Sequence, residues 1–186
     1  YQLAVHIRYL LFSGLAISRD GGATFQRHSR APILDRSDSE LLLRSAPHVI
    51  AGGPPWRMWY VAGDQHISAG GTTRPNYNIH FIQSDDGIHW PAKGDIVVKL
   101  KDDEYGLGRP FLASWDGRQL MFYSVRSHSG GYRLGYAELE DEQTWVRRDD
   151  QVGIEISDLG WDSEMLIWAA IISTEYGTYL FYNGNG

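Results

Sequence analysis

The sequence predicts an all-β protein built from repeated four-stranded antiparallel units. Its 186 residues include 21 glycines, 7 tryptophans and 11 tyrosines, a composition typical of short strands joined by tight turns. No run of a dozen residues has apolar side chains recurring every three and four positions, so we expect little helix. The third observation is that the sequence repeats internally, in two sets of segments that alternate along the chain.

The first repeated set consists of hairpin-like segments: "AISRDGGATF" at 16–25, "IQSDDGIHW" at 82–90 and "AELEDEQTW" at 137–145. Asp20, Asp86 and Asp141 occupy matching places, 66 and 55 residues apart. A short polar turn followed by an aromatic residue is typical of the hairpin that joins two antiparallel strands. We therefore expect an outer hairpin in each unit.

The second set contains "SAPHVIAGGPPWRMWYVAG" at 45–63, "GRPFLASWDGRQLMFYSVR" at 108–126 and the segment that begins at residue 163. Pro47 precedes Tyr60 by 13 residues, and Pro110 precedes Tyr123 by the same number. Four-stranded units at a period of about 40–60 residues are typical of β-propeller blades. An immunoglobulin-like sandwich is the alternative, but it would not repeat three times the aromatic triplet of the second strand, which is Met58-Trp59-Tyr60 in the first of these segments.

Each blade is expected to contain four strands in a fixed order. Strand one is short and apolar, at 48–51, 111–114 and 166–170. A turn such as "WDGR" at 115–118 leads to strand two, which contains the aromatic triplet. A variable loop then leads to strand three, at 77–84 and 132–139, and the polar hairpin returns strand four.

These elements predict a single partial propeller domain of about three blade equivalents. The expected divisions are a half blade at 1–30, blades at 45–92 and 108–150, and a half blade at 163–186. A closed propeller has four to eight blades. Two interpretations stay open: the chain is a fragment of a longer protein, or two copies join head to tail into a six-bladed homodimer without exposed edges.

The hairpin "SRDGGATF" at 18–25 is expected to fasten its blade rather than to bind substrate. Ser18 and Asp20 are placed to accept backbone N–H bonds within the turn. Gly22 provides the positive φ that the turn needs, and Phe25 is expected to anchor the outer strand in its blade. The stretch resembles the Asp-box of sialidases and other propellers, which lies on the blade rim.

Charge and composition exclude several classes of partner. The formal charge of −6 and the absence of a dense basic run argue against nucleic acid. No apolar stretch approaches the roughly 18 residues of a membrane span. The chain has no cysteine, and His66, His80 and His89 lack metal-ligand spacing, so we expect no metal and no cofactor.

The candidate site lies where loops from separate blades meet near the propeller axis. The loops before strand one and those between strands two and three open on the same face. Arginines, carboxylates, histidines and aromatic side chains there suit a polyhydroxylated or anionic ligand. The expected ligand is a carbohydrate, and the expected binding residues are Arg44, Arg109, Asp64, His66, Arg126, His128, Trp161 and Asn183. The alternative for Arg109 is an ion pair with Asp103 or Glu104.

The segments "SDDGIHW", "RMWYV", "GRPFL", "YRLGYAELED" and "WDSEM…YLFYNGNG" resemble the five-bladed propeller glycosidase superfamily of families 32, 43, 62, 68 and 130. The resemblance covers essentially the whole chain and extends to uncharacterised bacterial glycosidase-like proteins. It implies action on furanosides, arabinans, xylosides, fructans or β-mannosides.

The resemblance also implies catalytic carboxylates, of which glycoside hydrolysis normally needs two. Families 32 and 43 carry Asp before Pro at the start of early blades, but this chain has Ala46 and Arg109 there. Glu164 matches the acid of a later blade and is the expected general acid. Asp162 is expected on the same side of the strand, as an assisting carboxylate. The alternatives are a non-catalytic carbohydrate-binding or self-assembling propeller, and a truncated chain without selected activity.

Overall fold

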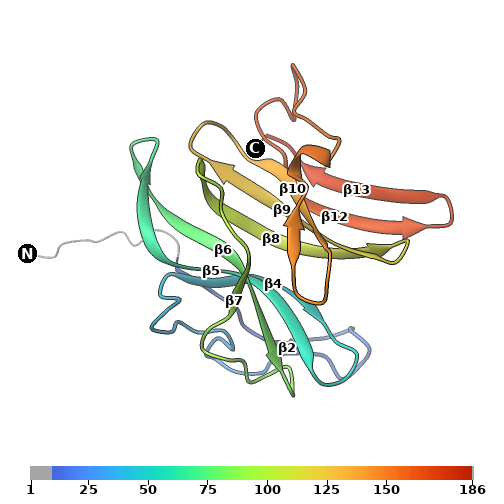
Figure 1. The fold of residues 1–186 in the computed structure, drawn as a ribbon. Coiled ribbons are helices and arrows are strands. Elements are labelled where there is room, and N and C mark those ends of the chain that lie inside the picture. The colour runs from blue at the N-terminus through green and yellow to red at the C-terminus, as the bar shows by residue number, and fades with distance from the viewer. Residues whose placement is uncertain (1–9, 186) are drawn as a thin grey trace, which may run out of the picture.

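The computed structural model describes residues 10–185, which form thirteen strands and one short 3-10 helix (Figure 1). The strands are β1 (Leu11–Phe12), β2 (Ala16–Ile17), β3 (Gln26–Arg27), β4 (Leu43–Ile50), β5 (Trp56–Ala69), β6 (Thr72–Ser84), β7 (Asp95–Val98), β8 (Glu104–Trp115), β9 (Arg118–Ser127), β10 (Arg133–Leu139), β11 (Trp145–Arg147), β12 (Ile167–Thr174) and β13 (Gly177–Asn183). The 3-10 helix η1 spans Asp149–Gln151. No helix in the described part of the chain is long and apolar enough to cross a membrane.

Two complete four-stranded antiparallel units occupy the middle of the chain. β4, β5, β6 and β7 pair in sequence order, as do β8, β9, β10 and β11. The β2–β3 hairpin precedes them, and the β12–β13 hairpin follows them at the other end of the molecule (Figure 1). The all-β propeller architecture predicted from the repeats is thus confirmed. The two complete blades span Leu43–Val98 and Glu104–Arg147, where 45–92 and 108–150 were predicted.

Successive blades are joined by short parallel contacts at the start of strand three. Leu11 pairs with Leu43, and Tyr77 pairs with Gly106. At the next junction the backbone N–H of Leu166 donates to the carbonyl oxygen of Tyr132. Leu11, Tyr77 and Tyr132 each precede their polar hairpin by the same number of residues, so β1 holds the place of strand three in the first half blade.

The main core lies between the two complete blades. Its buried side chains come from both of them and from all four strand positions. They are Trp59, Ile79, Val98, Leu107, Met121, Tyr123 and Ala137. Trp145 from β11 packs edge-on against Trp59 from β5, so the fourth strand of one blade covers the second strand of its neighbour.

Strands β5 and β6 are longer than the sequence predicts. Residues 64–76 were expected to form a variable loop, but β5 continues to Ala69 and β6 starts at Thr72. Gly70 and Gly71 have φ values of 57° and 71°, which give the two-residue turn that lets paired strands continue to their tip. Asp64 and His66 therefore lie on an extended hairpin and not in a loop, which corrects the expectation.

The "SRDGGATF" hairpin has the internal hydrogen bonds expected of it. Ser18 Oγ accepts from the N–H of Gly22 at 2.8 Å, and Asp20 accepts from the N–H and hydroxyl of Thr24 at 3.0 and 2.6 Å. Phe25, however, is 66% exposed and anchors nothing among the described residues. The expectation for Phe25 is therefore not met among the described residues, where its hairpin pairs only β2 with β3.

Candidate functional site

A bulge at the same place in strand one of each blade directs a side chain toward the axis. β4, β8 and β12 each contain a shift of register at this place, where strand one pairs with strand two, and β8 contains a second shift between Glu104 and Gly106. One residue at each shift has a left-handed backbone: Ala46 with φ 48°, Arg109 with φ 50° and Trp168 with φ 61°. Bulges of this kind redirect side chains and are frequent beside functional sites.

All three bulged residues line one cavity of about 530 Å³. The rest of its lining also comes from matching positions in successive blades. Strand two contributes Val61 and Ser124, which directly follow the aromatic triplets, and the start of strand three contributes Leu11, Tyr77 and Tyr132. Because equivalent residues of separate blades face it, the cavity lies on the axis that relates the blades. We call it the axial cavity.

Two arginines supply the charge of the axial cavity. The Arg109 guanidinium lies 5.8 Å from the ring centre of Trp168. The Arg126 guanidinium lies 4.7 Å from the ring centre of Tyr132 and 5.3 Å from that of Tyr105. The described residues that line the cavity include no carboxylate. The cavity is therefore positively charged in a chain whose net charge is −6.

Ser124 fixes the position of Trp168. Its hydroxyl oxygen accepts a hydrogen bond from the backbone N–H of Trp168 at 2.9 Å, and the serine is 1% exposed. The bond links strand two of one blade to the bulge of the next. It supports the left-handed backbone at Trp168, whose side chain is 47% exposed and available to a ligand.

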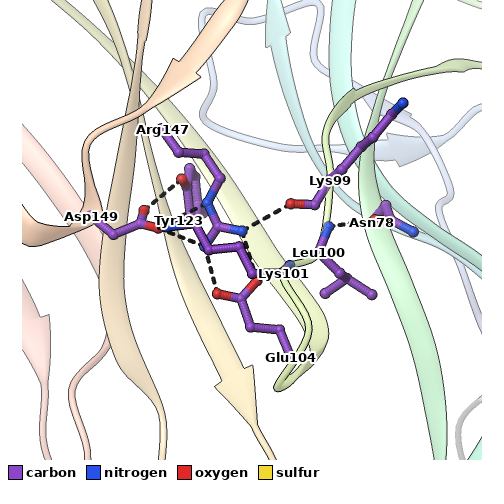
Figure 2. A network of polar contacts seen from close by, with 8 residues as sticks. All are labelled: Asn78, Lys99, Leu100, Lys101, Glu104, Tyr123, Arg147 and Asp149. Atoms are coloured by element: carbon purple, nitrogen blue, oxygen red, sulfur yellow. Dashed lines mark hydrogen bonds and ion pairs between the residues drawn. The ribbon is translucent and has the colours of Figure 1, made fainter.

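A tyrosine that ends the aromatic triplet hydrogen-bonds to a carboxylate in every blade described. Tyr123 Oη donates to Asp149 at 2.7 Å. Arg147 bridges Asp149 to Glu104, with bonds of 2.6 and 2.7 Å to the two Glu104 oxygens (Figure 2). Burial raises the pKa of Tyr123, so the phenol stays protonated and donates. These acids stabilise the blades and do not line the cavity.

Arg44 belongs to the same kind of network, which corrects its expected role in binding substrate. Its side chain is buried, with Nε 2.5 Å from Glu40 and the terminal nitrogens donating to the carbonyl oxygens of Asp35 and Pro91. Glu40 also accepts from Tyr60 Oη at 2.9 Å. With these partners the Arg44 guanidinium is directed into the blade, away from the axial cavity.

Asp162 and Glu164 do not form the expected carboxylate pair. They lie in a turn before β12, not on a strand, so alternation does not place them on one side. Asp162 is buried and accepts from Tyr182 Oη at 2.8 Å. Hydrogen bonds from Ser157 and Tyr182 lower the pKa of Asp162, which favours the ionised form and makes it a poor proton donor.

Glu164 lies beside a segment that lines the axial cavity. Its carbonyl oxygen accepts from Arg133 Nη1 at 3.0 Å, and a Cβ at Gly131 would clash with the same oxygen. Both contacts flank Tyr132, which lines the cavity. The Glu164 side chain is exposed and forms no hydrogen bond or ion pair with the described residues.

The other expected binding residues have exposed positions outside the cavity lining. Asp64 and His66 lie on β5, and His128 follows β9, with its ring 5.1 Å from that of Tyr105. Trp161 stacks on Tyr182. Asn183 ends β13 at the position equivalent to Val61 and Ser124. Of the eight, only Arg109 and Arg126 line the axial cavity. Within residues 10–185, no group of three metal-ligating side chains is close enough to hold a metal ion.

No known family profile matches the chain. Among curated proteins, it is 29% identical over 187 residues to the uncharacterized protein Rv1502 of Mycobacterium tuberculosis. The match covers all of this chain and 61% of Rv1502, so the chain spans about three fifths of the length of that relative.

Several solved structures have a similar fold although their sequences are only distantly similar to this one. BT0996, solved in a complex with RGII, matches 94% of this chain and 53% of its own at a TM-score of 0.73 and 20% identity. A thermostable family-43 glycoside hydrolase matches 91% of this chain and 55% of its own, at 0.60 and 21%. The GH32 β-fructofuranosidase BmSUC1 of Bombyx mori matches 90% and 35%, at 0.62 and 17%. The chain has the fold of the propeller glycosidases.

In this fold the structure corrects which residue of the third blade is equivalent to Ala46 and Arg109. Glu164 was expected there, but the pairing register assigns the position to Trp168. The sequence contained the signal for this. The 13 residues that separate Pro47 from Tyr60, counted back from Tyr182, lead to Ala169, and Trp168 directly precedes it. None of the three bulged positions carries an acid.

Proposed function

We propose that this chain is part of a carbohydrate-active propeller that binds a saccharide in the axial cavity. The observation that carries the proposal is the repeated bulge, which directs Ala46, Arg109 and Trp168 into one space of about 530 Å³. That volume is in the usual range for small-molecule sites. The shared fold supports the proposal, and so does the complex of BT0996 with the carbohydrate RGII.

The chemistry of the lining fits a sugar. Trp168 offers a half-exposed indole, a flat apolar surface on which the C–H face of a pyranose or furanose ring can pack. Tyr77, Tyr132 and Ser45 bring hydroxyl groups to the same cavity, where they can bond ring hydroxyls. An apolar platform with a few directed polar groups is typical of saccharide sites.

Binding is tested with a panel of mono- and oligosaccharides, by calorimetry and by tryptophan fluorescence. Trp168→Ala is expected to weaken binding at least tenfold, because the ring loses its apolar platform. Trp161→Ala is the matched control, since Trp161 is exposed and outside the cavity lining. Equal loss in both variants, or no binding to any saccharide by the unaltered chain, would contradict the proposal.

Hydrolysis requires a proton donor in addition to binding, and Glu164 is the proposed general acid. Its carboxylate is not committed to another described residue, and its backbone packs beside Tyr132 at the cavity. Glu164→Gln is expected to lower turnover of aryl furanosides or mannosides by about 100-fold, the low end of general-acid contributions, while binding is kept. Binding without any turnover by the unaltered chain would instead support the non-catalytic alternative.

A further inference from the structure

We propose that the axial cavity selects an anionic saccharide, whose carboxylate or sulfate group is bound by Arg109 and Arg126. The proposal rests on the proposed function and narrows its ligand class. Guanidinium groups bind planar carboxylates and sulfate oxygens through two parallel hydrogen bonds, which gives both strength and orientation.

The first argument is that both guanidinium groups lack an acidic partner in the described part of the chain. Neither forms an ion pair with a carboxylate among residues 10–185, and residues 1–9 contain no Asp or Glu. Asp103 and Glu104, which follow β7 in the sequence, bind other residues. Glu104 binds Arg147, and Asp103 binds Ser129. The alternative ion pair of Arg109 with these acids is therefore absent from the structure.

The second argument is that the arginines in the networks that hold the blades together have acidic partners. Arg44 binds Glu40, Arg147 binds Glu104 and Asp149, and Arg148 binds Glu140. In the axial cavity two arginines lie together without an acid among the described lining residues, in a chain of net charge −6. A negative ligand would supply the missing charge.

The third argument is that the fold does not require arginine at either position. The blade equivalents of Arg109 are Ala46 and Trp168, which occupy the same bulge with a similar backbone. The equivalent of Arg126 is Gly63, where a Cβ would clash with the carbonyl oxygen of Asn76. The two charges are thus specific to the second complete blade and are explained by a ligand better than by the architecture.

The fourth argument is that aromatic rings hold both guanidinium groups in place. Arg126 is half-buried over Tyr132 and Tyr105, and Arg109 lies over Trp168. Stacking on a ring occupies the flat face of a guanidinium, and although Arg126 also interacts with the Tyr77 hydroxyl, part of its N–H edge is left for a ligand. Less side-chain entropy is then lost when an anion binds. Trp168 can pack against the sugar ring while Arg109 bonds its acidic substituent.

The experiment compares matched ligands that differ only in charge. Oligogalacturonate and the same oligosaccharide after reduction of its carboxyl groups to alcohols are titrated into the 186-residue chain, at 50 and 200 mM salt. A sulfated galactan forms a second arm, which separates a carboxylate from a sulfate ester. We expect an acidic ligand to bind at least tenfold more tightly than the neutral one, with weaker binding at the higher salt.

Variants assign that preference to the two arginines. Arg109→Gln removes an exposed charge and is expected to keep the fold, while Arg126→Gln tests the half-buried partner. Each should remove most of the preference for the acidic ligand, measured as the ratio of its affinity to that of the reduced ligand in the same variant. Arg19→Gln, which removes the same charge from an exposed position on the β2–β3 hairpin, should change nothing.

Three results would overturn the inference in different ways. Equal affinity for the acidic and reduced ligands would exclude charge selection but leave saccharide binding in place. A preference lost equally in Arg19→Gln and Arg109→Gln would show a diffuse effect of net charge, and no site. Binding to neither ligand would contradict the proposed function itself, together with the inference.

Discussion

At the scale of single residues, Trp168 depends on a buried serine of the neighbouring blade. Its left-handed backbone is uncommon for a bulky residue, and such conformations persist only where the surroundings hold them. Ser124 provides that support through its hydroxyl oxygen. The tryptophan should therefore respond to a change at Ser124 even though a ligand in the cavity need not touch the serine hydroxyl.

We predict that Ser124→Ala destabilises the protein by about 1 kcal/mol and weakens saccharide binding severalfold. The lost bond leaves a buried N–H without its acceptor, which typically costs about 1–3 kcal/mol. Urea unfolding gives the stability change, and tryptophan fluorescence gives the affinity. Ser114→Ala, on an exposed part of β8, serves as control. Unchanged affinity in Ser124→Ala would show that Trp168 is held by other contacts.

At the scale of elements, the tyrosine–carboxylate contact is the repeated fastener of the blades. Glu40 receives bonds from Tyr60 Oη and from the N–H of Gly94, and lies near Arg44 and His80. Burial acts to raise the pKa of Glu40, but the hydrogen bonds from His80, Gly94 and Tyr60 and the charge of Arg44 lower it overall. Glu40 is therefore ionised in the folded protein at neutral pH.

This gives a pH dependence with a definite sign. Because the pKa of Glu40 is lower in the folded chain than its ordinary value of 4.5, its contribution to stability is complete above about pH 4.5. The contribution is lost as the pH falls from there through the folded-state pKa. Glu40→Gln should cost about 3 kcal/mol at pH 7, because it leaves Arg44 buried without its counter-charge.

Urea unfolding at pH 7 and pH 4 measures this prediction. The free energy of unfolding of the unaltered chain should fall more between these pH values than that of Glu40→Gln. Glu142→Gln, in an exposed hairpin, should follow the unaltered chain. The role assigned to Glu40 fails if both variants show the same pH dependence as the unaltered chain.

The elements were largely predictable because their signals are local. The turn chemistry of Ser18, Asp20 and Gly22 and the repeated triplets fix the order of strands within each blade. The site was harder to predict, because bulges depend on pairing between strands and leave little trace in composition. The burial of Arg44 was not predictable, because its partner Glu40 is recognised only once β4 and β5 are packed.

At the scale of the whole molecule, the β12–β13 hairpin exposes an apolar face whose equivalents in the two complete blades are buried. Phe181 is 62% exposed, whereas its equivalents Trp59 and Phe122 are 5% and 6% exposed. Ile172 and Tyr179 of the same hairpin are also about half exposed. Exposed apolar surface of this extent, next to an unpaired strand edge, is typical of an interface.

We predict that a second copy of the chain covers this face. β12 and β13 are strands one and two of a blade, while β1, β2 and β3 provide strands three and four, so head-to-tail pairing of two copies would complete both half blades. Sedimentation at tens of micromolar should then give twice the 21.1 kDa chain mass.

Phe181→Asp should return the protein to the mass of a single chain, because a charge would be buried at the interface. Tyr176→Asp, at the tip of the hairpin, should not. A single mass for the unaltered chain at every concentration would leave the face to be covered by further blades of a longer polypeptide, as the greater length of Rv1502 allows.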